Sequence, residues 1–309
     1  MPRELDLPRS ESDLNELFLS SAAYRNSAEF VKMMGFVARR SRIAPFNAYL
    51  LYIQKPDILR AASRAEWSAE GRFVKEGARP LIILKPFAPV EFVYDMEDTQ
   101  GSGVADGTKG AIGAKGADNG EAEDWRSKGF VPESEIAGIV ANMEAAGLCL
   151  DPLDLKELRL RYRVPVPFSQ ARREPSRRLQ GLRPGTGRKD LPAFFGALAN
   201  EYARHLLGHW GAFSVEINGK LHAVCDRDRS DLDRNEMEWE AECVAFIVCG
   251  RVGLGRGGAE VLARHLDPAI SKPRIDFFAV LAAANKTLKG FSLPKGPELP
   301  SDGLQLLLF

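Results

Sequence analysis

The chain has 309 residues, which is enough for two domains of ordinary size, each with its own hydrophobic core. Hydrophobic residues make up 45% of the sequence and charged residues 27%, the proportions of a globular protein. The 42 basic and 42 acidic residues balance, which excludes a chain-wide positive field, so any binding of nucleic acid must come from local patches.

The cysteines and the apolar runs narrow the class of protein further. None of the four cysteines stands in a CxxC pair, so neither a zinc knuckle nor a disulfide framework is indicated. Residues 1–15 are polar and acidic, without the apolar segment of a signal peptide. No apolar run approaches the roughly 18 residues that a membrane span needs. We therefore expect a cytoplasmic protein without a membrane partner.

The N-terminal third predicts helices followed by a β-hairpin. Apolar residues recur at helical spacing from Leu14 to Arg40, and Pro45 opens a further helix over Phe46–Gln54. The apolar run Pro80–Pro86 predicts a buried strand, and Val90–Tyr94 is its expected antiparallel partner across a proline-bounded turn.

Two charged segments predict loops. Glu97–Asp124 is rich in Gly, Ala and acidic residues, so it lacks the apolar surface needed to offset its own ordering entropy. It is either an insertion without a role or a mobile acidic cover for a basic DNA-binding face. Arg172–Lys189 is rich in Arg, Pro and Gly, and is either a solvated surface loop or a phosphate contact.

The second half predicts a mainly helical unit with a short antiparallel sheet. Its expected elements are a helix over Glu133–Ala146, a strand over Lys156–Val166, helices over Leu191–Trp210 and Met237–Val252, a hairpin over Phe213–Val224 with Asn218-Gly219 at its turn, and a helix over Ile275–Leu288. We expect an α+β protein with a helix-plus-β-hairpin domain at residues 12–101, a flexible loop at 102–128, a mainly helical domain at 129–289 and a flexible tail at 290–309.

Several pieces of the N-terminal region occur in an order known from one family. They are Asn47–Asp57, Trp67, Gly71–Gly77, Pro89–Asp95 and Thr99-Gln100-Gly101. In their order and spacing they resemble the N-terminal domain of ArdC-type antirestriction proteins and related plasmid-borne proteins. The resemblance implies a domain that binds single-stranded DNA.

The residue types of this region permit such binding, because cations contact the phosphate backbone and exposed aromatic rings stack on bases. Three arginines precede the helix that contains Asn47, and further cations flank Trp67. The predicted nucleic-acid-binding residues are Arg39, Arg40, Arg42, Asn47, Trp67, Arg72, Lys75 and Arg79. The alternative is that Trp67, Tyr49 and Tyr52 are core aromatics.

The predicted helix over Leu191–Trp210 carries a second resemblance. Its run Leu198–His209 resembles the metal-binding helix of ImmA/IrrE-like peptidases, the group to which the C-terminal domain of ArdC-type proteins belongs. The sequence Leu206-Leu207-Gly208-His209 fixes the alignment. The resemblance implies a zincin-like fold for the second domain.

The alignment shows that the metal site is degenerate. Asn200 and Arg204 stand where the family has the two histidines of its HExxH motif. Glu201 stands at the position of the general base, and Glu238 on the next helix stands at the third zinc ligand. A catalytic zinc needs three protein ligands, whereas Asn is a poor zinc ligand and Arg has no acceptor atom.

We therefore expect Asn200, Glu201, Arg204 and Glu238 to be vestigial, with no metal, no cofactor and no catalytic role. An ion pair of Arg204 with Glu238 would fill the place of the metal. The alternative is zinc at a shifted site formed by His205, His209 and Glu238, because histidines four residues apart share one face of a helix.

The last five residues form a separate motif. Gln305-Leu306-Leu307-Leu308-Phe309 follows a stretch rich in Pro and Gly and resembles the peptide that binds the bacterial sliding clamp. The predicted contacts are Gln305, Leu306, Leu308 and Phe309, with the amide in one subsite and the Leu/Phe pair in an apolar pocket. The alternative is a tail that folds back over an apolar patch of its own chain.

Together these features favour a non-catalytic accessory protein of a mobile element or of replication and repair, which binds single-stranded DNA and the sliding clamp. A second hypothesis is a zinc metalloendopeptidase of the ImmA/IrrE type that uses an altered metal site. A third is an antirestriction protein that acts by protein contact, with the acidic Glu97–Asp124 segment as a DNA-like surface.

Overall fold

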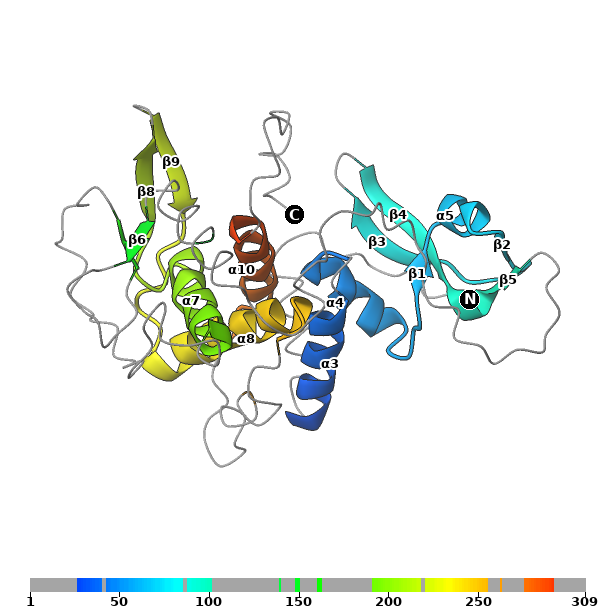
Figure 1. The fold of residues 1–309 in the computed structure, drawn as a ribbon, viewed down its shortest axis with the longest axis horizontal. Coiled ribbons are helices and arrows are strands. Elements are labelled where there is room, and N and C mark those ends of the chain that lie inside the picture. Colours follow the sequence, from blue (N-terminus) through cyan, green and yellow to red (C-terminus); the bar gives the residue numbers. More distant parts are fainter. Residues whose placement is uncertain are drawn as a thin grey trace.

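The fold is known from a computed structural model of the chain. The described residues are 27–40, 43–85, 88–101, 139, 148–150, 160–162, 191–217, 220–254, 262 and 275–291. Figure 1 shows the helices in the middle of the molecule, with β1–β5 and α5 at one end and the β8–β9 hairpin at the other. The structure is a mixed α+β arrangement with N-terminal helices, small antiparallel sheets and a mainly helical C-terminal part, as the sequence predicted.

Two helices begin the described part of the chain. Helix α3 spans Ser27–Arg39, and its apolar residues at spacings of three and four, including Phe30, Met33 and Val37, are completely buried. Helix α4 spans Pro45–Gln54 and begins with proline, whose fixed φ suits the first turn. This helix is confirmed to within one residue of its predicted start.

The predicted hairpin is the centre of a three-stranded sheet. Its strands are β3 (Leu81–Lys85) and β4 (Ala88–Asp95), and the short strand β1 (Ala61–Ala62) adds to the other edge of β4 in the order β1-β4-β3. Strands β2 (Arg72–Val74) and β5 (Thr99–Gly101) form a separate antiparallel ribbon, and the 3₁₀ turn η1 (Met96–Asp98) precedes β5.

Helix α5 (Arg64–Ala69) lies between β1 and β2 and begins with a capping box. The Ser63 side chain accepts a hydrogen bond from the backbone N–H of Glu66, and the Glu66 carboxylate accepts one from the backbone N–H of Ser63. Such reciprocal bonds satisfy the free N–H groups of the first turn, which explains how so short a helix is fixed.

The outer edge of β3 is covered by two side chains of α4. The Asn47 amide donates to the carbonyl of Leu84 at 2.8 Å and accepts from its N–H at 2.9 Å. The Gln54 amide makes the same pair of bonds with Ile82, at 2.8 and 2.9 Å. An exposed strand edge presents unpaired backbone groups, so these amides take the place of a further strand.

The C-terminal part contains three described helices and two described hairpins. The helices are α7 (Leu191–Leu206), α8 (Arg234–Arg251) and α10 (Phe277–Gly290). One hairpin pairs β8 (Phe213–Ile217) with β9 (Lys220–Cys225), and the other pairs β6 (Leu148–Leu150) with β7 (Leu160–Tyr162). The predicted hairpin and helices are confirmed, with ends that coincide or shift by up to four residues. The predicted helix over Glu133–Ala146 lies almost wholly outside the described residues, apart from the helical Ile139.

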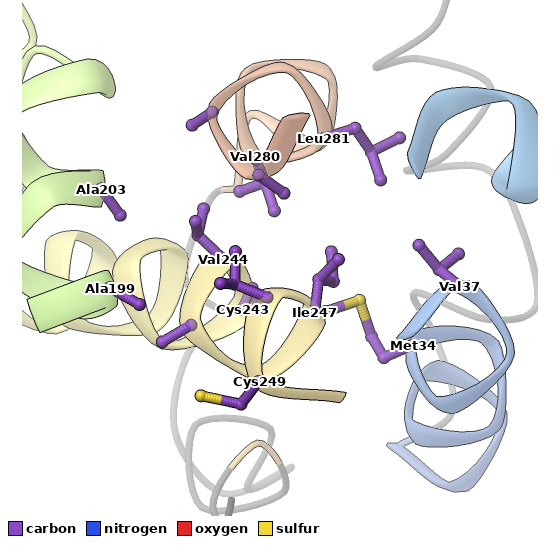
Figure 2. Packing of buried hydrophobic residues seen from close by; sticks show 14 of the residues in the cluster. Met34, Val37, Ala199, Ala203, Cys243, Val244, Ile247, Cys249, Val280 and Leu281 are labelled. Atoms are coloured by element: carbon purple, nitrogen blue, oxygen red, sulfur yellow. The ribbon is translucent and has the colours of Figure 1, made fainter. Parts of the chain in front are cut away.

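One hydrophobic core joins these helices to α3 and α4. Figure 2 shows Val244 and Ile247 of α8 between Val280 of α10 and Met34 of α3. Phe30 of α3 lies with its ring centroid 5.4 Å from that of Trp239 in α8. The two predicted domains, 12–101 and 129–289, therefore share a core, because the helices of the first pack on the helices of the second.

The contact between α3 and α8 depends on a small residue and a buried cation. A Cβ placed on Gly250 would lie 2.6 Å from the Cβ of Ala38, so only glycine permits this approach. Next to it, the buried guanidinium of Arg251 donates to the carbonyls of Val37 and Ile43. Burial lowers the pKa of Arg251 to about 10, which leaves it charged near neutral pH.

Within the described ranges, no helix is both long and apolar enough to cross a bilayer.

We predict that Asn47→Ala lowers the free energy of unfolding by about 1–3 kcal/mol, because it leaves the N–H and C=O of Leu84 without their partner. Urea unfolding followed by circular dichroism measures this change. Ile53→Ala is the control, since Ile53 is exposed on the same helix, and it should change stability by less than about 0.5 kcal/mol. Equal stability of Asn47→Ala and the parent protein would contradict the edge-covering role.

Candidate functional site

The residues of α7 that the resemblance places at the metal site form a buried polar layer against α8. Asn200, Glu201, Arg204 and His205 are all buried. The Asn200 amide donates to Oε2 of Glu242 in α8 at 3.0 Å, and Nε of Arg204 donates to Oδ1 of Asn200 at 3.3 Å. The positions that hold histidines in the resembling family therefore hold a hydrogen-bonded amide and a guanidinium here.

The expected ion pair of Arg204 with Glu238 is replaced by other contacts. Glu238 pairs with Arg234 at 3.2 Å, one turn earlier on its own helix, and its side chain is partly exposed. The carboxylate of α8 that reaches α7 is instead Glu242, one turn further along and completely enclosed. Among the ion pairs of the described residues, Arg204 with Glu238 does not occur. The Arg204 guanidinium also lies 6.0 Å from the ring centroid of Trp210.

A second buried network is centred on Glu240. Nε2 of His209 lies 2.9 Å from Oε2 of Glu240, and Arg229 donates two hydrogen bonds to the same carboxylate at 2.8 and 2.6 Å. The backbone N–H of Asp276, at the start of α10, donates to Oε1 at 2.7 Å. One carboxylate thus connects α8 to the end of α7, to the loop after β9 and to α10.

The electrostatics of this network follow from burial and from its partners. Burial opposes the charge of Glu240, but the hydrogen bonds from His209 and Arg229 hold the pKa of this carboxylate below its usual value. Burial lowers the pKa of His209, with Arg204 and Arg229 acting in the same direction. We therefore assign an ionised Glu240 and a neutral His209 near neutral pH.

The shifted metal site of the sequence alternative is not assembled. His205 lies 3.7 Å from Glu201, whereas His209 contacts Glu240, and Glu238 is directed to Arg234. Throughout the described part of the chain, no group of three or more His, Cys, Asp or Glu side chains is placed to hold a metal ion. Helix α7 ends at Leu206, so His205 lies in its last turn whereas His209 lies in the turn that follows the helix.

Gly208 explains this turn. Its φ of 74° lies in the left-handed region, and a Cβ at this position would lie 2.3 Å from the carbonyl oxygen of Arg227. The Gly208 carbonyl accepts a hydrogen bond from the N–H of Arg229 at 2.9 Å. Glycine thus allows the loop that carries Arg229 to dock on the end of α7 and to reach Glu240.

Sequence reasoning did not find Arg229, Glu240 or Glu242. Helix α8 carries glutamates at every second position from 236 to 242, and the sequence alone does not say which of them is buried. Positions 238 and 242 share a face of α8 because they are four residues apart. The sequence therefore predicts the correct face of the helix but places the contact one turn too early.

The predicted nucleic-acid-binding residues are mostly engaged within the protein. Trp67 is completely buried, and its indole N–H donates to the carbonyl of Tyr94 at 2.9 Å. The guanidinium groups of Arg60 and Arg72 lie 4.8 and 5.8 Å from its ring centroid. Tyr49 and Tyr52 are also buried, so these aromatics belong to the core, as the alternative reading stated.

Several of the predicted cations also donate hydrogen bonds to backbone carbonyls. Arg40 donates to the carbonyls of Ile58 and Leu59, Arg72 bonds Met96 and Thr99, and Lys75 bonds the carbonyl of Glu97. Arg39 and Arg79 are exposed. Arg42 and the tail residues Gln305, Leu306, Leu308 and Phe309 lie outside the described residues. The exposed cations, rather than the predicted ring, remain available to a ligand.

Comparison with protein-family models, with curated proteins and with solved structures gave no match.

We predict that Glu240→Gln lowers the free energy of unfolding by about 3 kcal/mol, because it leaves the Arg229 charge without its buried partner. Glu238→Gln is a matched control on the same helix, since its ion pair with Arg234 is partly exposed and should contribute less than about 1 kcal/mol. Chemical unfolding of both variants at neutral pH gives the comparison. Similar losses in the two variants would contradict the central role of Glu240.

Proposed function

We propose that the protein is a non-catalytic accessory protein that binds single-stranded DNA through its N-terminal half and the bacterial sliding clamp through its C-terminal peptide. Such a protein would serve a mobile element or the replication and repair machinery. The helical part would act as a scaffold that resembles an ImmA/IrrE-like peptidase without its metal chemistry.

The buried hydrogen bond of Asn200 to Glu242 in α8, with Arg204 bonded to the same amide, is the observation that carries the non-catalytic proposal. Asn200 is bonded to Glu242, so its amide and that carboxylate already satisfy each other. Arg204 adds a permanent positive charge next to them, and a guanidinium repels a cation and has no acceptor for it. A metal at this place would have to displace both groups.

The binding of single-stranded DNA is supported by the motif resemblance of the N-terminal region and by its exposed cations. Arg39 and Arg79 can reach phosphates without losing an internal contact that holds the backbone, unlike Arg40 and Arg72. Because basic and acidic residues balance over the whole chain, electrostatic attraction of DNA depends on local cations such as these. The clamp-binding proposal is supported by the C-terminal peptide alone.

We predict that the protein, purified without a histidine tag and incubated with zinc, retains far less than one equivalent of metal by mass spectrometry. The Asn200→His/Arg204→His double variant is the positive control, because it supplies neutral imidazoles in place of the amide and the charge. Stoichiometric zinc in the parent protein would favour the peptidase hypothesis instead.

We predict salt-dependent binding to a fluorescein-labelled oligothymidine of about 20 nucleotides, a length that covers a typical single-strand site. Arg39→Ala and Arg79→Ala should each weaken binding a few-fold and reduce the salt dependence by about 0.7 in logarithmic slope. Fluorescence anisotropy at several salt concentrations measures both effects. A duplex of equal length is the control, and equal affinity for it would argue against single-strand recognition.

We predict that removal of Gln305–Phe309 abolishes binding to the purified sliding clamp and leaves binding of single-stranded DNA unchanged. Surface plasmon resonance with immobilised clamp measures the first, and anisotropy measures the second. A Gln305→Ala/Phe309→Ala variant of the full chain separates the peptide contacts from chain length. Clamp binding that persists in both variants would show that the peptide is not the contact.

A further inference from the structure

One face of the β1-β4-β3 sheet is turned away from the helical core. Side chains alternate along each strand, and Leu81, Ile83 and Val93 pack against the core formed by the helices. Ile82 and Phe92 are directly opposite each other in the register, so both belong to the other face. Phe92 is 53% exposed there.

This face is covered at one end and open at the other. Tyr94 follows Phe92 on the same face and is buried in a small cluster with Ala62 and Trp67. Trp67 comes from α5, the short helix that Figure 1 shows beyond the end of β4. The Phe92 end belongs to neither this cluster nor the helical core.

Two cations border this face next to Tyr94, which follows Phe92 by two residues on the same strand. The guanidinium of Arg64 lies 4.8 Å from the ring centroid of Tyr94, and its Nε donates to the Tyr94 hydroxyl at 3.2 Å. Arg79 is exposed two residues before β3, next to Ala78, which packs against the Trp67 cluster. Both cations therefore stand beside the end of the face that Tyr94 occupies.

The acidic side chains near this face have other partners. Glu66 bonds Ser63 in the capping box, Glu70 pairs with Arg60, and Glu91 pairs with Lys85 at 3.0 Å. The negative charges of Glu70 and Glu91 are thus balanced by neighbouring cations, whereas Arg64 is directed at an aromatic ring. An exposed ring on one part of a sheet face and two cations at its Tyr94 end fit a ligand with flat apolar faces and a negative backbone.

On the basis of the proposed function, we propose that bases of single-stranded DNA stack on Phe92 at the open face of the β1-β4-β3 sheet, while the phosphates lie along Arg64 and Arg79. Single strands fit because their bases are free to stack, whereas the bases of a duplex are paired and stacked on one another. This assigns the stacking role to Phe92 in place of the buried Trp67.

The test uses three variants of the full chain and the labelled oligothymidine. Phe92→Ala removes the proposed stacking ring, and Phe92→Trp replaces it with a larger one. Phe73→Ala is the matched control, because Phe73 is 50% exposed but lies on the separate β2–β5 ribbon. Since these side chains are exposed, thermal unfolding should show all three variants to be as stable as the parent protein.

We expect Phe92→Ala to bind the oligonucleotide about ten-fold more weakly, the size of one lost base stack, and Phe73→Ala to bind within about two-fold of the parent. Phe92→Trp should retain binding, and its additional tryptophan fluorescence should be quenched on titration with DNA, which a purely structural ring would not show. Unchanged affinity of Phe92→Ala in a parent protein that binds DNA would overturn this assignment and leave the proposed function intact. Equal losses in Phe92→Ala and Phe73→Ala would also overturn it, and absence of DNA binding by the parent would overturn both.

Discussion

The burial of helix α8 is the constraint on which the rest of the structure depends. This helix lies in the middle of the core, yet it carries Glu240, Glu242 and Arg251 at buried positions. A buried charge is tolerated only when it is paired and hydrogen-bonded, so each of these residues needs a partner from another element. Glu242 meets α7, Glu240 meets the loop after β9 and the start of α10, and Arg251 meets the end of α3. The polar groups of one helix thereby fix the positions of its neighbours.

The same requirement applies to the buried polar layer formed by Asn200, Arg204 and Glu242. In a metal site, buried carboxylates are satisfied by a cation. Here Glu242 accepts from Asn200, and Arg204 adds its positive charge to the same layer. The polar groups of α7 and α8 thus satisfy one another inside the core. This arrangement is consistent with a scaffold whose helices are held together by internal hydrogen bonds, and it supports the non-catalytic proposal.

The N-terminal region shows why residue types alone do not define a binding surface. Arginines and aromatic rings were the predicted DNA contacts, but Trp67 forms the small core under α5, and Arg40 and Arg72 bond backbone carbonyls. Asn47, counted with them, covers the edge of β3. The exposed rings of this region are instead Phe73 and Phe92, and the alternation of a strand alone does not say which of its faces is exposed. A cation or an aromatic ring that could bind a ligand can equally bond the backbone or pack in the core of its own chain. The sequence pattern is the same in both cases.

The sequence by itself determined the helices α4, α7, α8 and α10 and the hairpins β3–β4 and β8–β9, because the periods of apolar residues and the turn signals are local properties. It also indicated that α7 and α8 face each other through polar residues. Only the tertiary structure decided that Glu242 rather than Glu238 makes this contact and that α3 and α4 share the core of the C-terminal helices. It likewise decided that Trp67 is buried and Phe92 exposed. Burial depends on which distant elements pack on a face, and no local pattern contains that information.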